Sequence, residues 1–303
     1  MLDVFLTVIL PTFVVAAIGA GLQRWRTLDV GALGAVAMYL LSPALVLNGL
    51  LTTDLPAEIS LRVVVAALLT LALALAVSFA LSAGARHPRS LQSGYTLATG
   101  FPNAGNMGIP ISFLAFGEQG LSVAIIIFVV QGTLSWPVGI FIAARGRSHG
   151  LAPLYSALKV PTLYAVPTAL LIRLTGWDMP VAIDRPIEML AEATIPVMLI
   201  VLGFQLSQGI DWVRWRSLAT SGVLRLTVSA GVAYIVTILI GLEGIAQQTV
   251  IVVAAMPTAV FTSILATEFD AEPKFVTSAV VVSTLASIGT LTILITILQN
   301  WLG

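Results

Sequence analysis

Apolar residues fill most of the chain in blocks about 20 residues long, the length that crosses a bilayer as an α-helix. Short polar stretches that carry Arg, Asp, Gly and Pro separate these blocks. The pattern predicts an all-α integral membrane protein with ten transmembrane helices and no separate soluble domain. We number the predicted segments 1 to 10, with approximate ranges 2–22, 33–52, 62–83, 90–117, 119–143, 151–174, 186–208, 216–241, 245–269 and 274–302.

Composition agrees with this pattern and excludes several kinds of chemistry. Of the 303 residues, 58% are hydrophobic and 9% are charged, and the net charge is zero, so we expect no nucleic-acid partner. The chain has no Cys, which rules out disulfides and thiolate metal sites. We predict no metal and no cofactor beyond a coupling ion, H⁺ or Na⁺. Segment 1 lacks a basic leader, so we expect a retained helix rather than a signal peptide.

Positively charged residues favour one side of the predicted membrane. Loops on the cytoplasmic side of membrane proteins carry an excess of Lys and Arg. The loops after odd-numbered segments hold Arg24, Arg26, Arg86, Arg89, Arg145, Arg147, Arg214, Arg216 and Lys274. The opposite loops hold Arg62, Arg173 and Arg185. We therefore predict a multi-pass protein of the plasma (inner) membrane with both termini outside.

Three proline landmarks recur in the same order in the two halves of the chain. The pairs are Pro11 with Pro161, Pro43 with Pro196, and Pro102 with Pro257, at spacings of 150, 153 and 155 residues. A single pair would carry little weight in so apolar a chain, but the ordered set favours a repeat. Because each half holds five crossings, we predict two inverted five-helix repeats, residues 1–143 and 151–303, joined by the linker 144–150.

Segment 4 contains a stretch that should break its helix inside the membrane. Between Gly100 and Pro110 stand three further glycines or prolines that disfavour a continuous helix, and segment 9 has Pro257 at the matching place. Irregular backbone survives at this depth only where protein buries it or where it lines a watery cavity. We therefore predict that segments 4 and 9 cross as broken helices, with their half-helix N-termini directed at a bound carboxylate.

Polar side chains around this crossover are candidates for substrate contact. Segment 4 supplies the amides of Asn103 and Asn106, and segment 9 supplies the hydroxyls of Thr258 and Thr262. The alternative for the asparagines is that they only cap the broken helix. Hydroxyl-bearing residues of segments 5 and 10, such as Ser283, could brace the crossover or hold an ion.

Other polar residues inside the predicted segments allow two interpretations each. Glu192 in segment 7 is either a proton carrier or an interfacial residue, and Asn48 and Gln205 either line the pathway or join helices by hydrogen bonds. Arg225 in segment 8 either snorkels to the cytoplasmic surface, pairs with an anion or mimics a bound cation.

Two motifs resemble the auxin efflux carrier family, which includes plant PIN transporters and bacterial permeases for malonate and related organic acids. The motifs are Asn103-Ala-Gly-Asn-Met-Gly-Ile-Pro110 and Met256-Pro-Thr-Ala-Val-Phe-Thr-Ser-Ile-Leu-Ala266. The resemblance covers essentially the whole chain. The sequence departs from it in two places: the second arm has Thr258 where the first has Asn103, and only Ala144 to Ala152 stands where plant carriers have a long hydrophilic loop.

The resemblance implies a fold similar to that of bile-acid sodium symporters. Segments 1, 2, 6 and 7 would form a scaffold, often dimeric, and segments 3–5 and 8–10 a mobile transport domain that works as an elevator. It also implies that the crossover prolines, Pro102 or Pro110 in the first arm and Pro257 in the second, belong to the substrate site together with the asparagines and threonines named above.

These observations predict a secondary transporter of small organic anions, mono- or dicarboxylates and auxin-like acids among them, and not an enzyme. An intramembrane enzyme would need machinery that is not visible here, since the chain has no His-Glu-x-x-His and no Gly-x-Ser-x-Gly. A channel or sensor on the same fold is the other alternative. The expected partners are the substrate, the lipid bilayer and a second copy of the chain.

Overall fold

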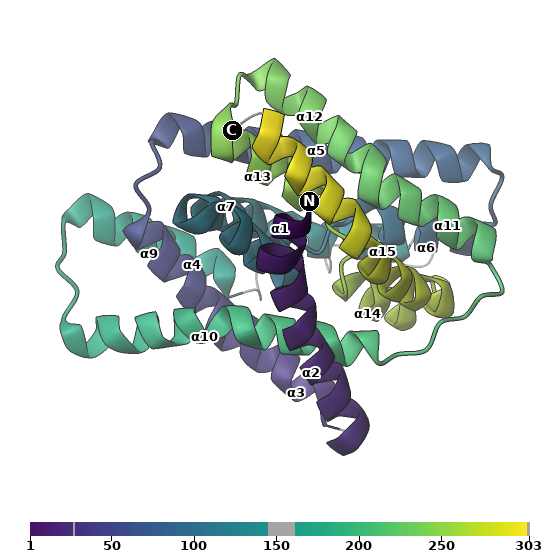
Figure 1. The fold of residues 1–303 in the computed structure, drawn as a ribbon, viewed down its shortest axis with the longest axis horizontal. Coiled ribbons are helices and arrows are strands. Elements are labelled where there is room, and N and C mark those ends of the chain that lie inside the picture. The colour runs from purple at the N-terminus through teal and green to yellow at the C-terminus, as the bar shows by residue number, and fades with distance from the viewer. Residues whose placement is uncertain (27, 145–160, 302–303) are drawn as a thin grey trace.

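The computed structural model describes residues 1–26, 28–144 and 161–301, and its regular structure over these ranges is helical (Figure 1). The described residues contain no β-strand, only one isolated bridge between Pro102 and Thr258. The linker predicted at 144–150 and the first part of segment 6 lie outside the described residues, apart from Ala144.

The first half of the chain forms four helical stretches before Gly117. The first is continuous through α1 (Leu2–Val4), η1 (Phe5–Ile9) and α2 (Leu10–Arg26), and the second through α3 (Val30–Val36), η2 (Ala37–Leu41) and α4 (Ser42–Thr52). The third is α5 (Ala57–Gly84). The fourth is interrupted: α6 (Arg89–Gly100) is followed by an irregular segment and then by η3 (Ala104–Gly108) and α7 (Ile109–Ala143).

Gly117 separates predicted segments 4 and 5 within α7. Its φ of 63° and ψ of −153° are not helical and are open to glycine but costly for other residues. The chain changes direction there and continues as a second helix to Ala143. The predicted boundary between segments 4 and 5, at residues 117 to 119, coincides with this break.

The second half contains another interrupted helix. Its elements are α9 (Thr162–Thr175), α10 (Val181–Leu206), α11 (Trp215–Val223), η4 (Leu224–Val228), α12 (Ser229–Ile240), α13 (Gly244–Ala254), α14 (Phe261–Glu268) and α15 (Pro273–Trp301). Between α13 and α14 the chain is irregular, as it is between α6 and η3.

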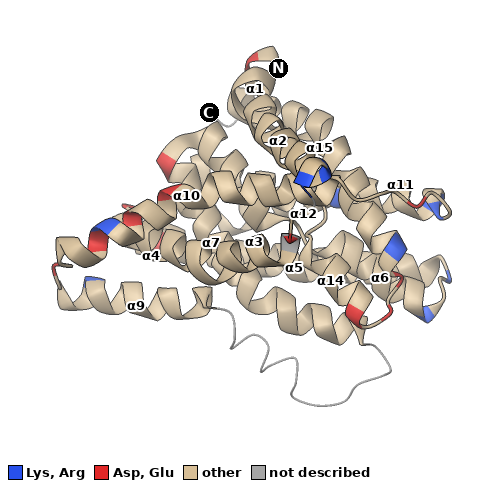
Figure 2. Cartoon of the chain, turned by 90° about the horizontal axis from the view of Figure 1, so that it is seen from below, with Lys and Arg blue, Asp and Glu red and all other residues tan. Residues whose placement is uncertain are grey.

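Seven helical stretches among the described residues are long and apolar enough to span a membrane. They cover Leu2–Arg26, Gly31–Thr52, Ala57–Gly84, Ala104–Ala143, Val181–Leu206, Trp215–Ile240 and Pro273–Trp301, and α9 and α13 are shorter apolar helices. The chain is thus a multi-pass membrane protein, while ten crossings and an inverted repeat remain predictions. Figure 2 shows helix bodies that are mostly uncharged, with blue and red segments mainly near their ends.

Helices α2 and α10 cross in direct contact through glycine (Figure 1). A Cβ placed on Gly203 would lie 1.9 Å from the carbonyl oxygen of Ala16, and one placed on Gly19 would lie 2.6 Å from that of Ile200. Small residues at a membrane-helix crossing allow the two backbones to approach closely. This pair joins predicted scaffold segments 1 and 7.

Candidate functional site

The two irregular segments lie side by side and exchange main-chain hydrogen bonds. The N–H of Asn103 donates to the carbonyl of Pro257 at 2.8 Å, and the N–H of Ala259 donates to the carbonyl of Phe101 at 3.0 Å. All four residues are buried. Pro102 and Pro257 lack an N–H, so neither segment can continue as a regular helix, and the exchange satisfies the backbone that the breaks would leave unpaired.

The geometry of this exchange refines the predicted correspondence between the arms. The two donors, Asn103 and Ala259, are 156 residues apart in the sequence, as are the two acceptors, Phe101 and Pro257. The bridge therefore places Pro102 opposite Thr258. The proline landmarks had paired Pro102 with Pro257, one residue earlier. Thr258 occupies the place of Pro102, and Ala259 that of Asn103.

Asn103 caps the helix that follows the first break and also keeps a free donor. Its Oδ1 accepts the N–H of Asn106 at 3.1 Å, while its Nδ2 has no hydrogen-bond partner among the described residues, although Asn103 is only 4% exposed. A buried donor without a partner costs roughly 1–3 kcal/mol, so such groups call for a functional explanation. Capping and ligand binding, the two predicted roles, are compatible because they use different atoms of one amide. Asn106 is half-buried beside it.

The hydroxyls of the second arm already have acceptors. Thr258 Oγ1 donates to the carbonyl of Ala98 at 2.6 Å, near the end of α6, and Thr262 Oγ1 donates to the carbonyl of Ala259 at 2.6 Å. The N–H of Thr258 donates to Ser283 Oγ at 3.0 Å, which is the bracing by segment 10 that the sequence predicted. The second arm therefore holds the crossover together, whereas the first arm presents the free amide.

Of the two candidate prolines in the first arm, Pro102 marks the break. Pro110 is buried more than one turn inside the continuous helix formed by η3 and α7, so it does not mark the break. The break thus begins directly after α6, and the helix that starts with η3 contains the rest of the segment 4 motif.

Arg225 lies in the middle of the crossover and does not extend to the membrane surface. Its side chain is 0% exposed; Nη1 donates to the carbonyl of Thr99 at 2.9 Å, and Nη2 donates to the carbonyl of Ala254. Thr99 is in the last turn of α6 and Ala254 is the last residue of α13, so one guanidinium joins the C-terminal ends of both leading half-helices. Neither carbonyl was predicted as its partner, because the sequence cannot show which helix ends converge.

The remaining predicted residues make no hydrogen bond to the crossover in the described part of the chain. Gln205 on α10 is buried and its Oε1 lacks a partner. Asn48 on α4 is half-buried, and Glu192 on α10 is exposed. Helix α10 does contact η3, so Gln205 and Glu192 belong to an element that borders the first arm.

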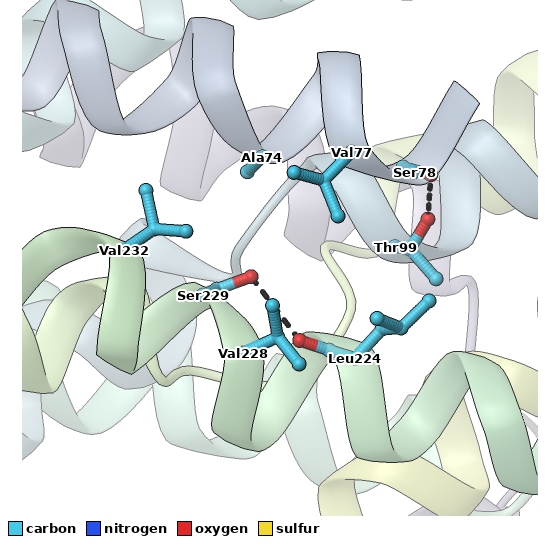
Figure 3. A pocket seen from close by; sticks show the side chains of 8 residues that line it. All are labelled: Ala74, Val77, Ser78, Thr99, Leu224, Val228, Ser229 and Val232. Carbon is cyan, nitrogen blue, oxygen red and sulfur yellow. Dashed lines mark hydrogen bonds between the residues drawn. The ribbon is translucent and has the colours of Figure 1, made fainter. Parts of the chain in front are cut away.

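A small cavity lies beside the crossover, between α5, α6 and the stretch from η4 to α12 (Figure 3). Its volume of about 10 Å³ accommodates roughly one water molecule, too little for a carboxylate. Thr99 contributes to its wall, and the Thr99 hydroxyl is hydrogen-bonded to that of Ser78. The cavity is therefore not a substrate site in this conformation.

A larger cleft of about 530 Å³ lies at the opposite ends of the helices from the crossover break. Arg214 Nη2 forms an ion pair with Glu272 Oε1 at 3.0 Å on its wall, and Ser90 donates to the same carboxylate oxygen at 3.1 Å. The cleft is also lined by Asp211 and Lys274. These loops belong to the side of the membrane that the distribution of Arg and Lys predicts to be cytoplasmic.

Comparison with known proteins defines the class to which this architecture belongs. The family model described as membrane transport protein matches residues 4–153 and 146–295, and the chain belongs to this family. The resemblance to PIN-like permeases predicted from the two motifs is thereby confirmed.

Curated relatives carry related names. The "Uncharacterized transporter MJ1031" of Methanocaldococcus jannaschii is 26% identical over 215 residues, which cover 69% of this chain and 68% of the relative. An "Uncharacterized transporter" of Methanothermobacter thermautotrophicus is 27% identical over 64% of each chain. The "Putative malonate transporter" of Rhizobium meliloti is 23% identical over 67% of this chain and 66% of the relative. The matches thus span about two thirds of the relatives' length.

Proposed function

We propose that the protein is a secondary transporter of small organic anions, mono- or dicarboxylates, and that it binds them at the crossover of the two broken helices. The observation that carries the proposal is the Nδ2 of Asn103, a buried donor with no partner at the start of the helix formed by η3 and α7. A carboxylate oxygen is the acceptor that such a donor lacks, and it would form a charge-assisted hydrogen bond.

Helix-end electrostatics support an anion over a cation. Each helix end carries about half an elementary charge, positive at the N-terminus and negative at the C-terminus. The crossover brings together two C-terminal ends, those of α6 and α13, and Arg225 donates to both. The N-terminal ends of η3 and α14 have no such buried counter-charge, since their caps are the neutral residues Asn103 and Val260. The uncompensated ends therefore favour a negative ligand.

The size of the substrate is inferred from the relatives. One relative is named for malonate, a small dicarboxylate. At 23% identity that name is no assignment for this chain, and the proposal extends only to the class of small carboxylates.

We further propose that transport follows an elevator mechanism of alternating access. The scaffold would be segments 1, 2, 6 and 7, with α2 and α10 as its close-packed centre, and the transport domain would carry the crossover. The same proposal includes four further features: a homodimer through the scaffold, location in the inner membrane, termini on the outer side, and H⁺ or Na⁺ as the coupling ion. Because the chain has no native Cys, single cysteines labelled from one side of the membrane test the orientation directly.

The substrate class is tested by a thermal-shift screen of the purified protein against small carboxylates, amino acids and neutral solutes. A ligand that binds the native fold raises its melting temperature by mass action. We expect a mono- or dicarboxylate to stabilise the wild type, and the corresponding amide or alcohol to have no effect. Stabilisation by neutral solutes alone would contradict the anion site.

Uptake into proteoliposomes separates a carrier from a channel on the same fold. A carrier saturates with substrate and accelerates when unlabelled substrate is present on the opposite side. A channel shows neither behaviour, and this outcome would replace the proposed mechanism while leaving the binding site in place.

A further inference from the structure

We propose that Arg225 is a built-in cation: its guanidinium fills a cation site formed by the converging C-terminal ends of α6 and α13, so that the crossover needs no bound metal cation. The inference deepens the proposed function, because it concerns the coupling ion of the same crossover. It rests on three features of the described structure, which are the ligands of the guanidinium, its burial and its lack of an acidic partner.

The ligands of Arg225 are those expected for a cation. Both acceptors, the carbonyls of Thr99 and Ala254, belong to last turns of helices, where carbonyl oxygens lack intrahelical partners and carry partial negative charge. The two acceptor residues are 155 residues apart in the sequence and are brought together at the guanidinium. Two separate N–H groups reach them, which matches the fork geometry of Arg.

Arg225 is fully buried, and no carboxylate of the described residues pairs with it. An isolated buried charge is very costly, and Arg does not lose its proton in proteins, so the surroundings must supply the compensating negative charge. Within the described ranges, neither ion pair includes Arg225, and its Nε has no hydrogen-bond partner. The two helix ends are therefore its counter-charge, and together they amount to about one elementary charge.

Local structure places the guanidinium there. Arg225 lies in η4, a π-helical turn between α11 and α12, and such wide turns change which face of a helix a residue occupies. Nearby, the Thr99 hydroxyl donates to the carbonyl of Tyr95 within α6 and is hydrogen-bonded to the hydroxyl of Ser78, which ties the end of α6 to α5. The carbonyls are thus preorganised around one cation that is covalently part of the chain.

The test uses chemical rescue of Arg225→Ala in detergent, without any transport substrate. We expect the variant to melt at a lower temperature than the wild type, and free guanidinium at about 10 mM, well below denaturing concentrations, to restore at least half of the loss by mass action. Methylguanidinium should rescue as well, whereas equimolar Na⁺ or tetramethylammonium should not. Absence of guanidinium rescue in a folded variant would overturn the proposal.

Arg173→Ala is the matched control. Arg173 also donates to two carbonyls near a helix end, those of Leu50 at 3.0 Å and Thr53 at 3.2 Å, but it is exposed. Water can replace an exposed guanidinium, so we expect a small loss of stability and no rescue. Equal rescue of both variants would show a general effect of guanidinium and would overturn the proposal.

A second measurement keeps the proposal falsifiable if Arg225→Ala does not fold. The melting temperature and the uptake rate of the wild type are measured with Na⁺ replaced by choline, and we expect no change in either. Stabilisation of the wild type by Na⁺, or uptake that requires Na⁺, would overturn the built-in cation. A failed carboxylate screen combined with guanidinium rescue would instead overturn the proposed substrate and leave the Arg225 site standing.

Discussion

The crossover and the contact between α2 and α10 differ in their backbone structure and in the groups that they bury. At the α2–α10 contact, Gly19 and Gly203 let two regular helices touch backbone to backbone. At the crossover, both helices are interrupted. The helix ends, the side-chain amide of Asn103 and the guanidinium of Arg225 are buried there. The first arrangement provides rigidity, and the second provides polar groups at the depth where a substrate must pass.

This difference indicates where stability and function reside. A close glycine contact tolerates no additional atoms, so substitutions there should reduce stability without selecting among substrates. The crossover is held by Thr258, Ser283 and the two exchanged main-chain bonds, which leaves Asn103 free to act on a ligand. Five substitutions are considered in order of the effect expected, and the first four test this division directly.

Asn103→Asp should have the largest effect, a loss of substrate uptake of about 100-fold or more, equivalent to roughly 2.7 kcal/mol. The new Oδ1 can still accept the N–H of Asn106, so the cap is retained, while a negative oxygen replaces the free donor and repels a carboxylate. Uptake into proteoliposomes and the melting temperature are measured together. Asn300→Asp, at an exposed position near the end of α15, is the control and should leave uptake unchanged. Unchanged uptake in Asn103→Asp would remove the proposed site.

Asn103→Ala separates the two roles of this residue. The sequence alone predicts that it abolishes binding and leaves stability nearly intact. The structure adds a stability cost, because the variant also loses the hydrogen bond to Asn106, and a lost N-cap costs about 0.5–2 kcal/mol.

Gly203→Ala should destabilise the scaffold by about 1–3 kcal/mol or more, because the new methyl group would overlap the backbone of Ala16. The melting temperature of the purified protein measures this cost, and substrate preference should not change. Gly21→Ala is the control, since a Cβ at this position in α2 meets no atom within 4 Å. If both variants behave alike, the close contact between α2 and α10 does not determine stability.

The pattern of apolar blocks was sufficient to predict an all-helical membrane protein, and two proline-containing motifs were sufficient to locate both breaks. The positions of Pro102 and Pro257 in the irregular segments follow from their missing N–H groups, a local property that can be read from sequence. Ser283 was one of several hydroxyl-bearing residues for which the sequence left bracing and ion binding open, and the structure shows its bond to the N–H of Thr258. These features depend on periodicity and backbone chemistry, which neighbouring residues determine.

Contacts between distant segments could not be predicted in the same way. For Arg225 the sequence left snorkelling, pairing with an anion and mimicry of a bound cation open, and only the fold reveals that α6 and α13 end beside it. The pairing of Pro102 with Thr258 differs by one residue from the aligned prolines, since a hydrogen-bond register depends on how two segments dock. The direction of the Thr258 hydroxyl depends on the same docking, because its acceptor is the carbonyl of Ala98.

Thr258→Val should lower stability by about 1–3 kcal/mol, because it leaves the carbonyl of Ala98 without the hydroxyl that satisfies it. Uptake should fall only in proportion to the amount of folded protein, in contrast to Asn103→Asp. Thr267→Val on α14 is the control: its hydroxyl also donates to a carbonyl, that of Ser263, but the residue is exposed. A selective loss of substrate affinity in Thr258→Val would place the second arm in the binding site after all.

The smallest effect should come from His87, in the loop that joins α5 to α6. Burial lowers the pKa of His87 below its usual 6.5, and the positive charge of Arg214 lowers it further. The folded protein therefore binds this proton less tightly than the unfolded chain, so the stabilising contribution is complete above pH 6.5 and is lost as the pH falls from 6.5 through the folded pKa. We expect His87→Gln to reduce the change in melting temperature between pH 5 and pH 7. This reduction should be smaller than the drop in melting temperature caused by Thr258→Val. Arg214→Gln removes only the positive charge near His87, so it should reduce the pH dependence of the melting temperature less than His87→Gln does. A larger reduction in Arg214→Gln would instead indicate a contribution from its ion pair with Glu272.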